Sequence, residues 1–377
     1  MIRIRDIALP PEHNAHQLQY EVAQLLKVSA SKVRQLKIVR RSVDARKKPD
    51  IKIIYTIDVA VDGNEKRLLK QSGCKRATIA PVSYYKAAKN IPAPEKRPVV
   101  VGFGPAGMFA ALVLAIAGWK PLVLERGEDA ASRNEKVERF FATGQLDERS
   151  NVQFGEGGAG TFSDGKLNTQ THSPLNRQVL RTFVRFGAPE EILYLAKPHI
   201  GSDKLKTVVK NMREYIRAQG GEVLFNTRLE EIFIRDGRIR EIAIKSLNKD
   251  MVCPYGEKLP VSALILAIGH SARDTFEMLY ERGVPMEAKP FAVGVRIEHP
   301  QTLIDEGLYG DFAGHPALPK GEYQLSHRVD GRGVYTFCMC PGGVVVPSSS
   351  EENTIVTNGM SHFARDGVNA NSAVVVS

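Results

Sequence analysis

Three glycines and one acidic residue have the types and spacing that bind a dinucleotide. The apolar run 99–101 is followed at once by Gly102, Gly104 and Gly107, and then by small and apolar residues typical of a helix (108–118). In such a turn the first glycine allows a tight bend, the second lets the backbone approach a pyrophosphate, and the third lets the helix pack on the strand. Glu125 follows the next apolar run, 23 residues after Gly102, where a carboxylate accepts ribose hydroxyls. The register of strand, turn, helix, strand and acid predicts a dinucleotide site rather than a glycine-rich turn without a ligand.

A second glycine-rich segment, 151–167, follows the acid and has five glycines between residues 155 and 165. Such a run does not form a regular core element, but its amides are free to face an anion. Asp164 and Lys166 add hydrogen-bonding groups to it. A flexible surface loop is the alternative, yet Phe154 and Phe162 would anchor the segment, so we favour contact with a ligand.

Candidate reactive side chains come from two later strands. His270 and Arg273 follow the apolar strand 263–269, where they would face an anion or a flavin, although either alone is more often structural. Cys338 and Cys340 would point to one face of an extended strand, as a redox pair or a metal site. The other two cysteines lie in other segments, so we expect no metal site and favour small buried residues beside a cofactor.

Composition and charge bound the class of protein. The chain has 377 residues, 43% hydrophobic and 25% charged, and none of its apolar runs reaches the roughly 18 residues of a membrane helix. Four scattered cysteines and a start without a signal peptide predict a cytoplasmic protein. The net charge of +10 lies entirely ahead of residue 91, and the basic segment 40–48 could hold phosphates of a nucleic acid. No aromatic residues interleave it, so we favour an ordinary solvated hairpin end.

The chain order predicts an α/β protein with several parts. Residues 1–90 have the order β-α-β-β-α-β of a ferredoxin-like unit, and 91–98 form a proline-rich linker. A Rossmann-like domain (99–170 and 203–285) is interrupted by a β-meander with its turn at Asp236-Gly237. A mixed α+β substrate domain (171–202 and 286–377) has strands expected at 291–297, 323–326, 333–339 and 342–347. The apolar end, 373–377, would be an unfinished sheet edge, which predicts a C-terminally truncated chain.

Six stretches of the chain together resemble the uncharacterised FAD-dependent, or NAD(FAD)-utilising, dehydrogenases of the glutathione-reductase-type flavoprotein superfamily. The resemblance covers essentially the whole chain and is carried by residues 41–47, 101–107, 151–167, 197–205, 267–275 and 337–343. It implies an FAD domain with an inserted substrate domain and an added N-terminal domain. It also implies a further glycine-rich C-terminal segment against the flavin, beyond residue 377.

The residues themselves also favour FAD over NAD as the cofactor. An interrupted Rossmann unit, a closing Ala-x-Gly strand and a second glycine loop suit an extended FAD. A second Gly-x-Gly-x-x-Gly set between an apolar strand and a helix, as a separate NAD(P)H domain would need, is missing, so a nicotinamide would dock transiently. We therefore expect an FAD-dependent oxidoreductase that transfers hydride or electrons to or from an unknown small substrate. An RNA-associated flavoprotein and a truncated, non-catalytic flavin fold are the alternatives. The expected catalytic residues are His270, Arg273 and Cys338, and the expected FAD contacts are Gly102, Gly104, Pro105, Ala106, Gly107, Glu125, Arg126, Gly157, Gly158, Ala159, Val223, Ala267 and Gly269.

Overall fold

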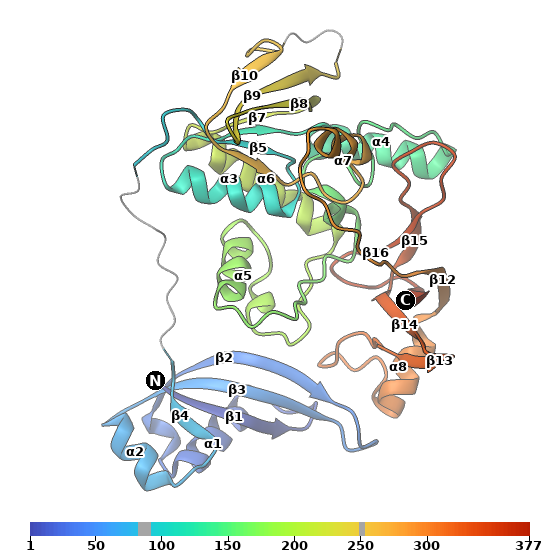
Figure 1. The fold of residues 1–377 in the computed structure, drawn as a ribbon. Helices are drawn as coiled ribbons and strands as arrows, with labels where there is room; N and C mark the ends of the chain where they lie inside the picture. The colour runs from blue at the N-terminus through green and yellow to red at the C-terminus, as the bar shows by residue number, and fades with distance from the viewer. Residues whose placement is uncertain (82–91, 249–252) are drawn as a thin grey trace.

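The computed structural model describes residues 1–81, 92–248 and 253–377. An N-terminal sheet lies at the bottom of the view, a parallel sheet with its helices lies at the top, and the C-terminal sheets lie on the right (Figure 1). The last residues of the predicted N-terminal unit (82–90) and the first of the predicted linker (91) fall outside the described part. None of the described helices combines the length and the apolar character needed to cross a membrane.

The N-terminal unit has the predicted order of elements and a four-stranded antiparallel sheet in the order β2-β3-β1-β4, which is the ferredoxin-like order. Ile2 and Ile4 point into its core, and a bulge at Asp6 (φ 56°) shifts the phase so that Ile7 and Leu9 are buried as well. The elements are β1 (Ile2–Leu9), α1 (Ala15–Leu26), η1 (Ala30–Lys32), β2 (Val33–Asp44), β3 (Lys52–Val61), α2 (Glu65–Ser72) and β4 (Ala77–Ile79).

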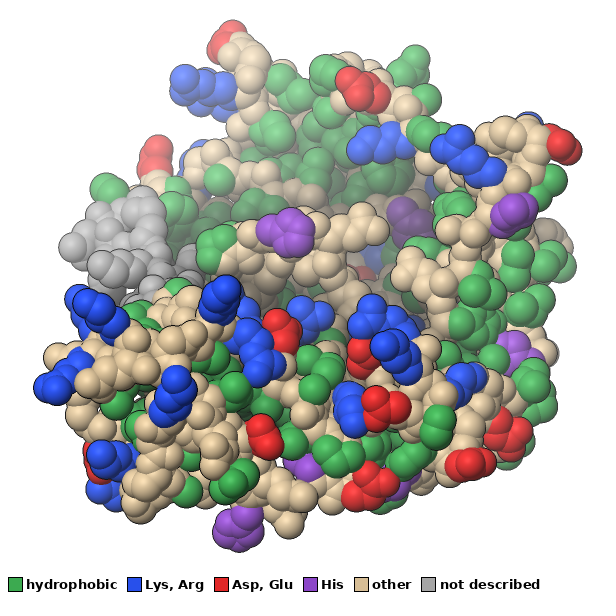
Figure 2. Space-filling view, turned by 90° about the horizontal axis from the view of Figure 1, so that it is seen from below, with side chains coloured by type: hydrophobic (Ala, Val, Ile, Leu, Met, Phe, Trp, Pro, Cys, Tyr) green, Lys and Arg blue, Asp and Glu red, His purple; other side chains and the backbone are tan. Residues whose placement is uncertain are grey.

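The basic segment 40–48 contacts the rest of the chain. Arg41 donates through Nη2 to Ala317 O at 2.6 Å, and Lys48 donates through Nζ to Gly307 O at 2.5 Å. Arg46 pairs with Asp44 at 2.7 Å. On the underside of the molecule, Lys and Arg side chains stand singly or in small groups, several beside acidic ones (Figure 2). Part of this basic charge therefore fastens the N-terminal unit to the C-terminal region, and the prediction of a nucleic-acid partner stays a prediction.

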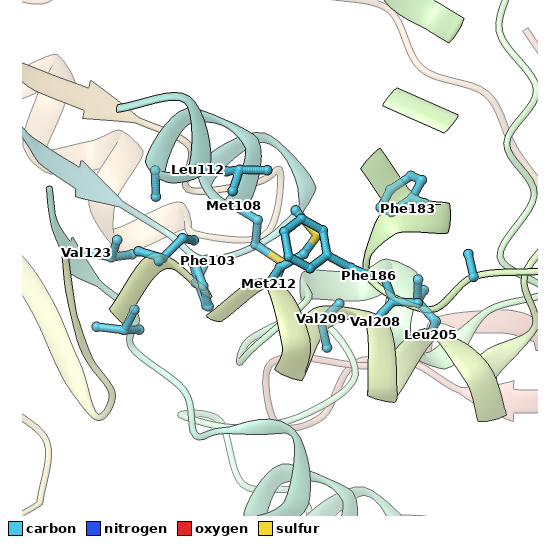
Figure 3. Close-up of a cluster of buried hydrophobic side chains, with 14 of the residues drawn as sticks. Phe103, Met108, Leu112, Val123, Phe183, Phe186, Leu205, Val208, Val209 and Met212 are labelled. Carbon is cyan, nitrogen blue, oxygen red and sulfur yellow. The ribbon is translucent and has the colours of Figure 1, made fainter. Parts of the chain in front are cut away.

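The central sheet is parallel and has the order β11-β5-β6-β7. Val100 and Val123 face a core with two helices, which also takes in Phe183 and Phe186 (Figure 3). Val99 faces the opposite core, against the β-meander. Near-continuous apolar strands are buried on both faces in this way, as expected for a parallel sheet. The elements are β5 (Val99–Val101), α3 (Pro105–Ile116), β6 (Leu122–Leu124), α4 (Ala130–Thr143), η2 (Gly158–Phe162), α5 (Leu175–Arg185), η3 (Glu190–Leu193), α6 (Ser202–Ala218), β7 (Glu222–Leu224), β11 (Leu264–Leu266) and α7 (Arg273–Glu281).

The predicted β-meander is present as β8 (Thr227–Arg235), β9 (Arg238–Ser246) and β10 (Lys258–Pro260), in the order β10-β9-β8. Asp236 (φ 53°) and Gly237 (φ 69°) form its tight turn, and two positive φ values are what a two-residue hairpin of this hand requires. The predicted domain boundaries stay predictions. Apolar residues of α5, which lies in the segment 171–202 assigned to the substrate domain, pack into the core formed with α3 and α6.

The C-terminal region is built on an antiparallel sheet in the order β12-β17-β14-β13, with a separate β15-β16 pair. Its last strand, β17, lies between β12 and β14 and is paired on both sides, so the prediction that 373–377 form an unfinished edge is wrong. The strand predicted at 323–326 begins only at Ser326. The elements are β12 (Val293–Pro300), α8 (Gln301–Tyr309), η4 (Gly310–Phe312), β13 (Ser326–Val329), β14 (Arg332–Cys340), β15 (Val344–Pro347), β16 (Thr357–Met360) and β17 (Asn369–Val376).

Candidate functional site

A cavity of about 720 Å³ opens at the carboxyl ends of the parallel strands, where open α/β sheets bind their ligands. Its walls come from the Gly102–Gly107 turn, the second glycine loop, the start of β8 and the segment between β11 and α7. The predicted residues that line it are Gly102, Gly104, Pro105, Ala106, Glu125, Arg126, Gly158, Ala159, Ala267, Gly269 and His270.

The three glycines of the first turn differ in what requires them. A methyl group at Gly102 would lie 2.3 Å from Ala267 O, and one at Gly107 would lie 1.9 Å from Gly102 O, so packing of the chain itself excludes a side chain. A methyl group at Gly104 would meet only Gly158 Cα at an ordinary 3.6 Å. Gly104 is also the N-cap of α3 and leaves the first-turn amides without a side-chain cap. Those amides and the space beside them are available to an anion.

Glu125 is buried and links the two glycine segments. Its Oε2 accepts the amide of Phe103 at 2.7 Å, and its Oε1 accepts the amides of Gly127 and Gly155, each at 2.9 Å. The sequence predicted ribose hydroxyls as its partners. The structure shows a second role that was not predicted. The carboxylate joins the Gly102–Gly107 turn to the second glycine loop and so fixes the distance between these two segments. Three backbone donors leave one of its four acceptor positions, on Oε2.

Arg133 binds the backbone carbonyls of the second glycine loop. It is fully buried and donates through Nε to Asn151 O (2.8 Å), through Nη1 to Glu156 O (2.6 Å) and through Nη2 to Val152 O and Gly158 O (2.9 Å each). A methyl group at Gly155 would lie 2.4 Å from Arg133 Cδ, so this glycine makes room for the arginine. Burial lowers the pKa of Arg133 to about 10, against the attraction of the nearby Glu125 and Glu156 carboxylates.

Arg126 forms a charged wall on the side of β8. Its Nη2 donates to Asp274 Oδ1 at 2.8 Å and to Thr275 Oγ1 at 3.0 Å, while the guanidinium lies 4.5 Å from the centre of the Phe154 ring. Arg228 reaches the other oxygen of Asp274 at 3.1 Å. Burial raises the pKa of Asp274, but the hydrogen bond and charge of Arg126, together with Arg228, outweigh it and lower the pKa overall.

Several predicted residues lie outside the cavity walls. Gly107 and Gly157 shape the backbone, and a methyl group at Gly157 would lie 2.2 Å from Thr161 Oγ1. Val223 is buried in the middle of β7, so the prediction that it contacts the cofactor is not supported. Arg273 begins α7 and pairs with Glu351 at 2.7 Å instead of facing the cavity.

The cavity residues that the sequence did not single out lie at the start of β8, on α7 and in the segment after α7. The rule that ligands bind beyond the carboxyl ends of parallel strands could have found those after β7, since the next strand starts there. They include Thr227, Arg228 and Leu229 after β7, and Phe276, Leu279, Val284 and Met286 in α7 and the segment that follows it.

Cys338 and Cys340 do not share a face. Cys338 has a left-handed backbone (φ 51°), and the pairing of β14 with β17 shifts register between Phe337 and Cys340. Cys338 is exposed and Cys340 is buried, where burial raises the pKa of its thiol to about 11. The irregular strand therefore removes the basis for the predicted pair, and Cys338 is not among the residues that line the cavity.

The end of the second glycine loop is joined to the C-terminal region by buried and half-buried charges. Asp164 accepts Arg365 Nε at 2.9 Å and a hydrogen bond from Ser361 Oγ. Lys166 donates to Glu322 at 3.0 Å. Burial raises the pKa of Glu322, but the charges of Lys166 and Lys197 outweigh it and bring the pKa to about 2. The protein itself thus uses the Asp164 and Lys166 side chains that the sequence offered to a ligand.

The fold and cavity define a chain with two glycine-rich segments around a cavity at the carboxyl ends of a parallel sheet. Comparison with known proteins adds the family. The chain is 48% identical to an uncharacterized protein of Clostridium beijerinckii over 378 aligned positions, a match that covers 100% of this chain and 69% of that protein, and it belongs to the same family. Residues 290–377 match the family described as FAD-dependent protein, C-terminal domain-like, and residues 1–60 match Domain of unknown function (DUF8436).

The solved structures to which the chain is similar are more distant. Thermovibrio ammonificans THI4 is 18% identical, with 50% of this chain and 62% of that chain covered and a TM-score of 0.33. The glycerol-3-phosphate dehydrogenase of Bacillus halodurans, complexed with FAD, is 14% identical, with 75% and 48% covered and a TM-score of 0.33. The chain thus spans between about half and 62% of these two structures.

Proposed function

We propose that the chain is the FAD-binding part of a flavin-dependent oxidoreductase of the glutathione-reductase type. The observation that carries the proposal is Gly104, a glycine that packing does not require, at an uncapped helix N-terminus that faces a 720 Å³ cavity. The match of residues 290–377 to an FAD-dependent family supports FAD as the dinucleotide.

The residues present fit such a cofactor. The first-turn amides of α3 and the amide of Ala159 would hold the pyrophosphate, and the remaining acceptor position of Glu125 Oε2 would take a ribose hydroxyl. Bound FAD would supply hydride or electron transfer. The chain's own part is to bind, to orient and to exclude water. Arg126 and Phe154 close one wall of the cavity, and His270 lines it among the segments after β11.

A spectrum of the purified protein tests the proposal directly. We expect a yellow protein, or one that becomes yellow when FAD is added, whose flavin absorbance bleaches under anaerobic NADH or NADPH. We propose a reduced nicotinamide, docking transiently, as the electron donor. A protein that remains colourless after FAD is added and the excess is removed would contradict the proposal.

The glycines of the first turn separate ligand binding from folding. Gly104→Ala should change the free energy of unfolding by less than about 1 kcal/mol, because its methyl group meets nothing closer than 3.6 Å, yet it should weaken FAD binding at least about tenfold. Gly107→Ala is the matched control. It should destabilise the fold itself, because its methyl group would lie 1.9 Å from Gly102 O. Equal FAD affinity in Gly104→Ala and the wild type would refute the assigned pyrophosphate position.

A further inference from the structure

The guanidinium of Arg296, on β12, is fixed at one end and free at the other. Its Nη1 donates to Asn371 Oδ1 at 2.5 Å and more weakly to Cys338 O at 3.5 Å. These are its only hydrogen bonds within the described residues, and its Nε is buried without a partner. The N–H groups of Nε and Nη2 therefore have no hydrogen-bond acceptor among the described residues.

Elsewhere in this protein the same edge of an arginine holds a carboxylate. Arg3 grips Asp58 through Nε at 2.7 Å and Nη2 at 2.8 Å. Arg365 grips Asp164 in the same two-pronged way. A planar carboxylate matches this fork in both spacing and charge. Arg296 has the same fork, held in place by Asn371, but the described residues supply it with no carboxylate.

The surroundings make this arrangement costly without an anion. Arg296 is half-buried, and burial lowers its pKa, as expected for a cation with no counter-charge. Asn371 is fully buried, and its Nδ2 is a second donor without an acceptor. A methyl group at Gly359 would lie 2.4 Å from Asn371 Oδ1 and 2.6 Å from Arg296 Nη1, so a glycine stands where the pair needs room.

The sheet also offers an apolar surface beside the fork. Arg296 is opposite Ala373 on β17, which is opposite Phe337 on β14, so the three side chains share one face. Phe337 is 60% exposed. Two strand spacings put it roughly 10 Å from Arg296 across the small alanine.

We propose that Arg296 is the anchor of a binding site for a small carboxylic acid with an apolar or aromatic body. The carboxylate binds the guanidinium at Nη2, because Nε of the same edge is itself buried. Asn371 holds the guanidinium in position, and the body of the acid lies over Ala373 toward Phe337. The site is built from the C-terminal sheet alone and does not depend on the proposed flavin function. Occupation by the substrate of the flavin reaction would be a further step that does rest on that function.

Calorimetric titration of the purified protein with 3-phenylpropionate, its neutral amide and inorganic phosphate tests the site. We expect the acid to bind and the amide to bind at least about tenfold more weakly, because it lacks the charge that the fork recognises. Arg296→Gln should abolish acid binding, and Arg296→Lys should keep only part of it, because lysine lacks the fork. Arg328→Gln, an exposed arginine of the same sheet, is the matched control and should bind like the wild type.

Stability without ligand separates a binding role from a structural one. An unpaired, half-buried cation contributes little to the fold, so Arg296→Gln should unfold at the same or a higher urea concentration than the wild type. A large loss of stability in Arg296→Gln would overturn the proposal in favour of a structural arginine. The proposal would also be overturned by equal binding of acid and amide, by unchanged acid binding in Arg296→Gln, or by phosphate binding as tight as that of the acid. Absence of acid binding at 20 mM, about the highest dissociation constant of a weak specific site, would overturn it as well.

Discussion

Replacing Arg133 by methionine should loosen the second glycine loop and destabilise the fold by about 3 kcal/mol. The side chain makes four hydrogen bonds to loop carbonyls, which at about 1.5 kcal/mol each for a charged donor total about 6 kcal/mol. Against this stands the cost of burying the cation. Its pKa falls from 12.5 to about 10, which corresponds to about 3 kcal/mol. Methionine fills the space but supplies no donors, so the net loss is the difference between the two terms.

Urea unfolding, followed by circular dichroism, measures this loss. Arg139→Met is the matched control, since Arg139 lies on the same helix, is exposed, and should change stability by no more than about 0.5 kcal/mol. Because the loop lines the cavity through Gly158, Arg133→Met should also weaken FAD binding at temperatures where the variant is folded. A variant within about 1 kcal/mol of the wild type, with unchanged FAD affinity, would refute the idea that Arg133 organises the loop.

Two further predictions concern the C-terminal half. Glu322 is held at a pKa of about 2, below its ordinary 4.5, so its ionised form stabilises the fold above pH 4.5 and this contribution disappears as the pH falls toward 2. Glu322→Gln should therefore lower the free energy of unfolding by up to about 3 kcal/mol at pH 7. It should also weaken the decrease in stability below pH 4.5, as measured by urea unfolding at several pH values. An unchanged decrease would contradict the role given to Glu322. A thiol reagent at pH 8 should modify exposed Cys338 fastest and spare buried Cys340, whose thiol has a pKa of about 11, while the half-exposed Cys74 and Cys253 react more slowly. Peptide mass spectrometry identifies the modified residues, and Cys338→Ser should remove the fastest phase. Rapid modification of Cys340 would show that the strand is regular or open there.

Local signals in the sequence were enough to predict the elements of the parallel sheet, the β-meander and many of the residues that line the cavity. The glycine turn, the apolar strands around it and the turn at Asp236-Gly237 each depend on residues that are neighbours in the chain, so their types predict their structure directly. Eleven of the predicted residues meet at the cavity for the same reason: the carboxyl ends of parallel strands share one edge.

The remaining features depend on contacts that the sequence pattern does not mark. Arg133 sits in an ordinary polar helix, and its acceptors lie 18 to 25 residues further along the chain. Glu125 has the predicted position, but three of its acceptor positions take hydrogen bonds from backbone amides of the first glycine turn, of Gly127 and of the second glycine loop. The prediction that Cys338 and Cys340 share one face was wrong, because it took β14 as a regular strand. An irregularity at Cys338 leaves that thiol exposed and the thiol of Cys340 buried.

The central position of β17 also sets an order of events during synthesis. Strand β12 pairs only with β17 within its sheet, and the paired residues are between 69 and 83 positions apart, from Pro300 with Asn369 to Val293 with Val376. On the ribosome, β12 must therefore leave the exit tunnel and wait for the whole of α8, β13 and β14 before its partner exists. Such long-range pairing folds slowly and leaves strand edges open meanwhile. The parallel sheet, its core and the cavity need nothing beyond Met286, so this half of the molecule can fold first and offer the late sheet a surface on which to assemble.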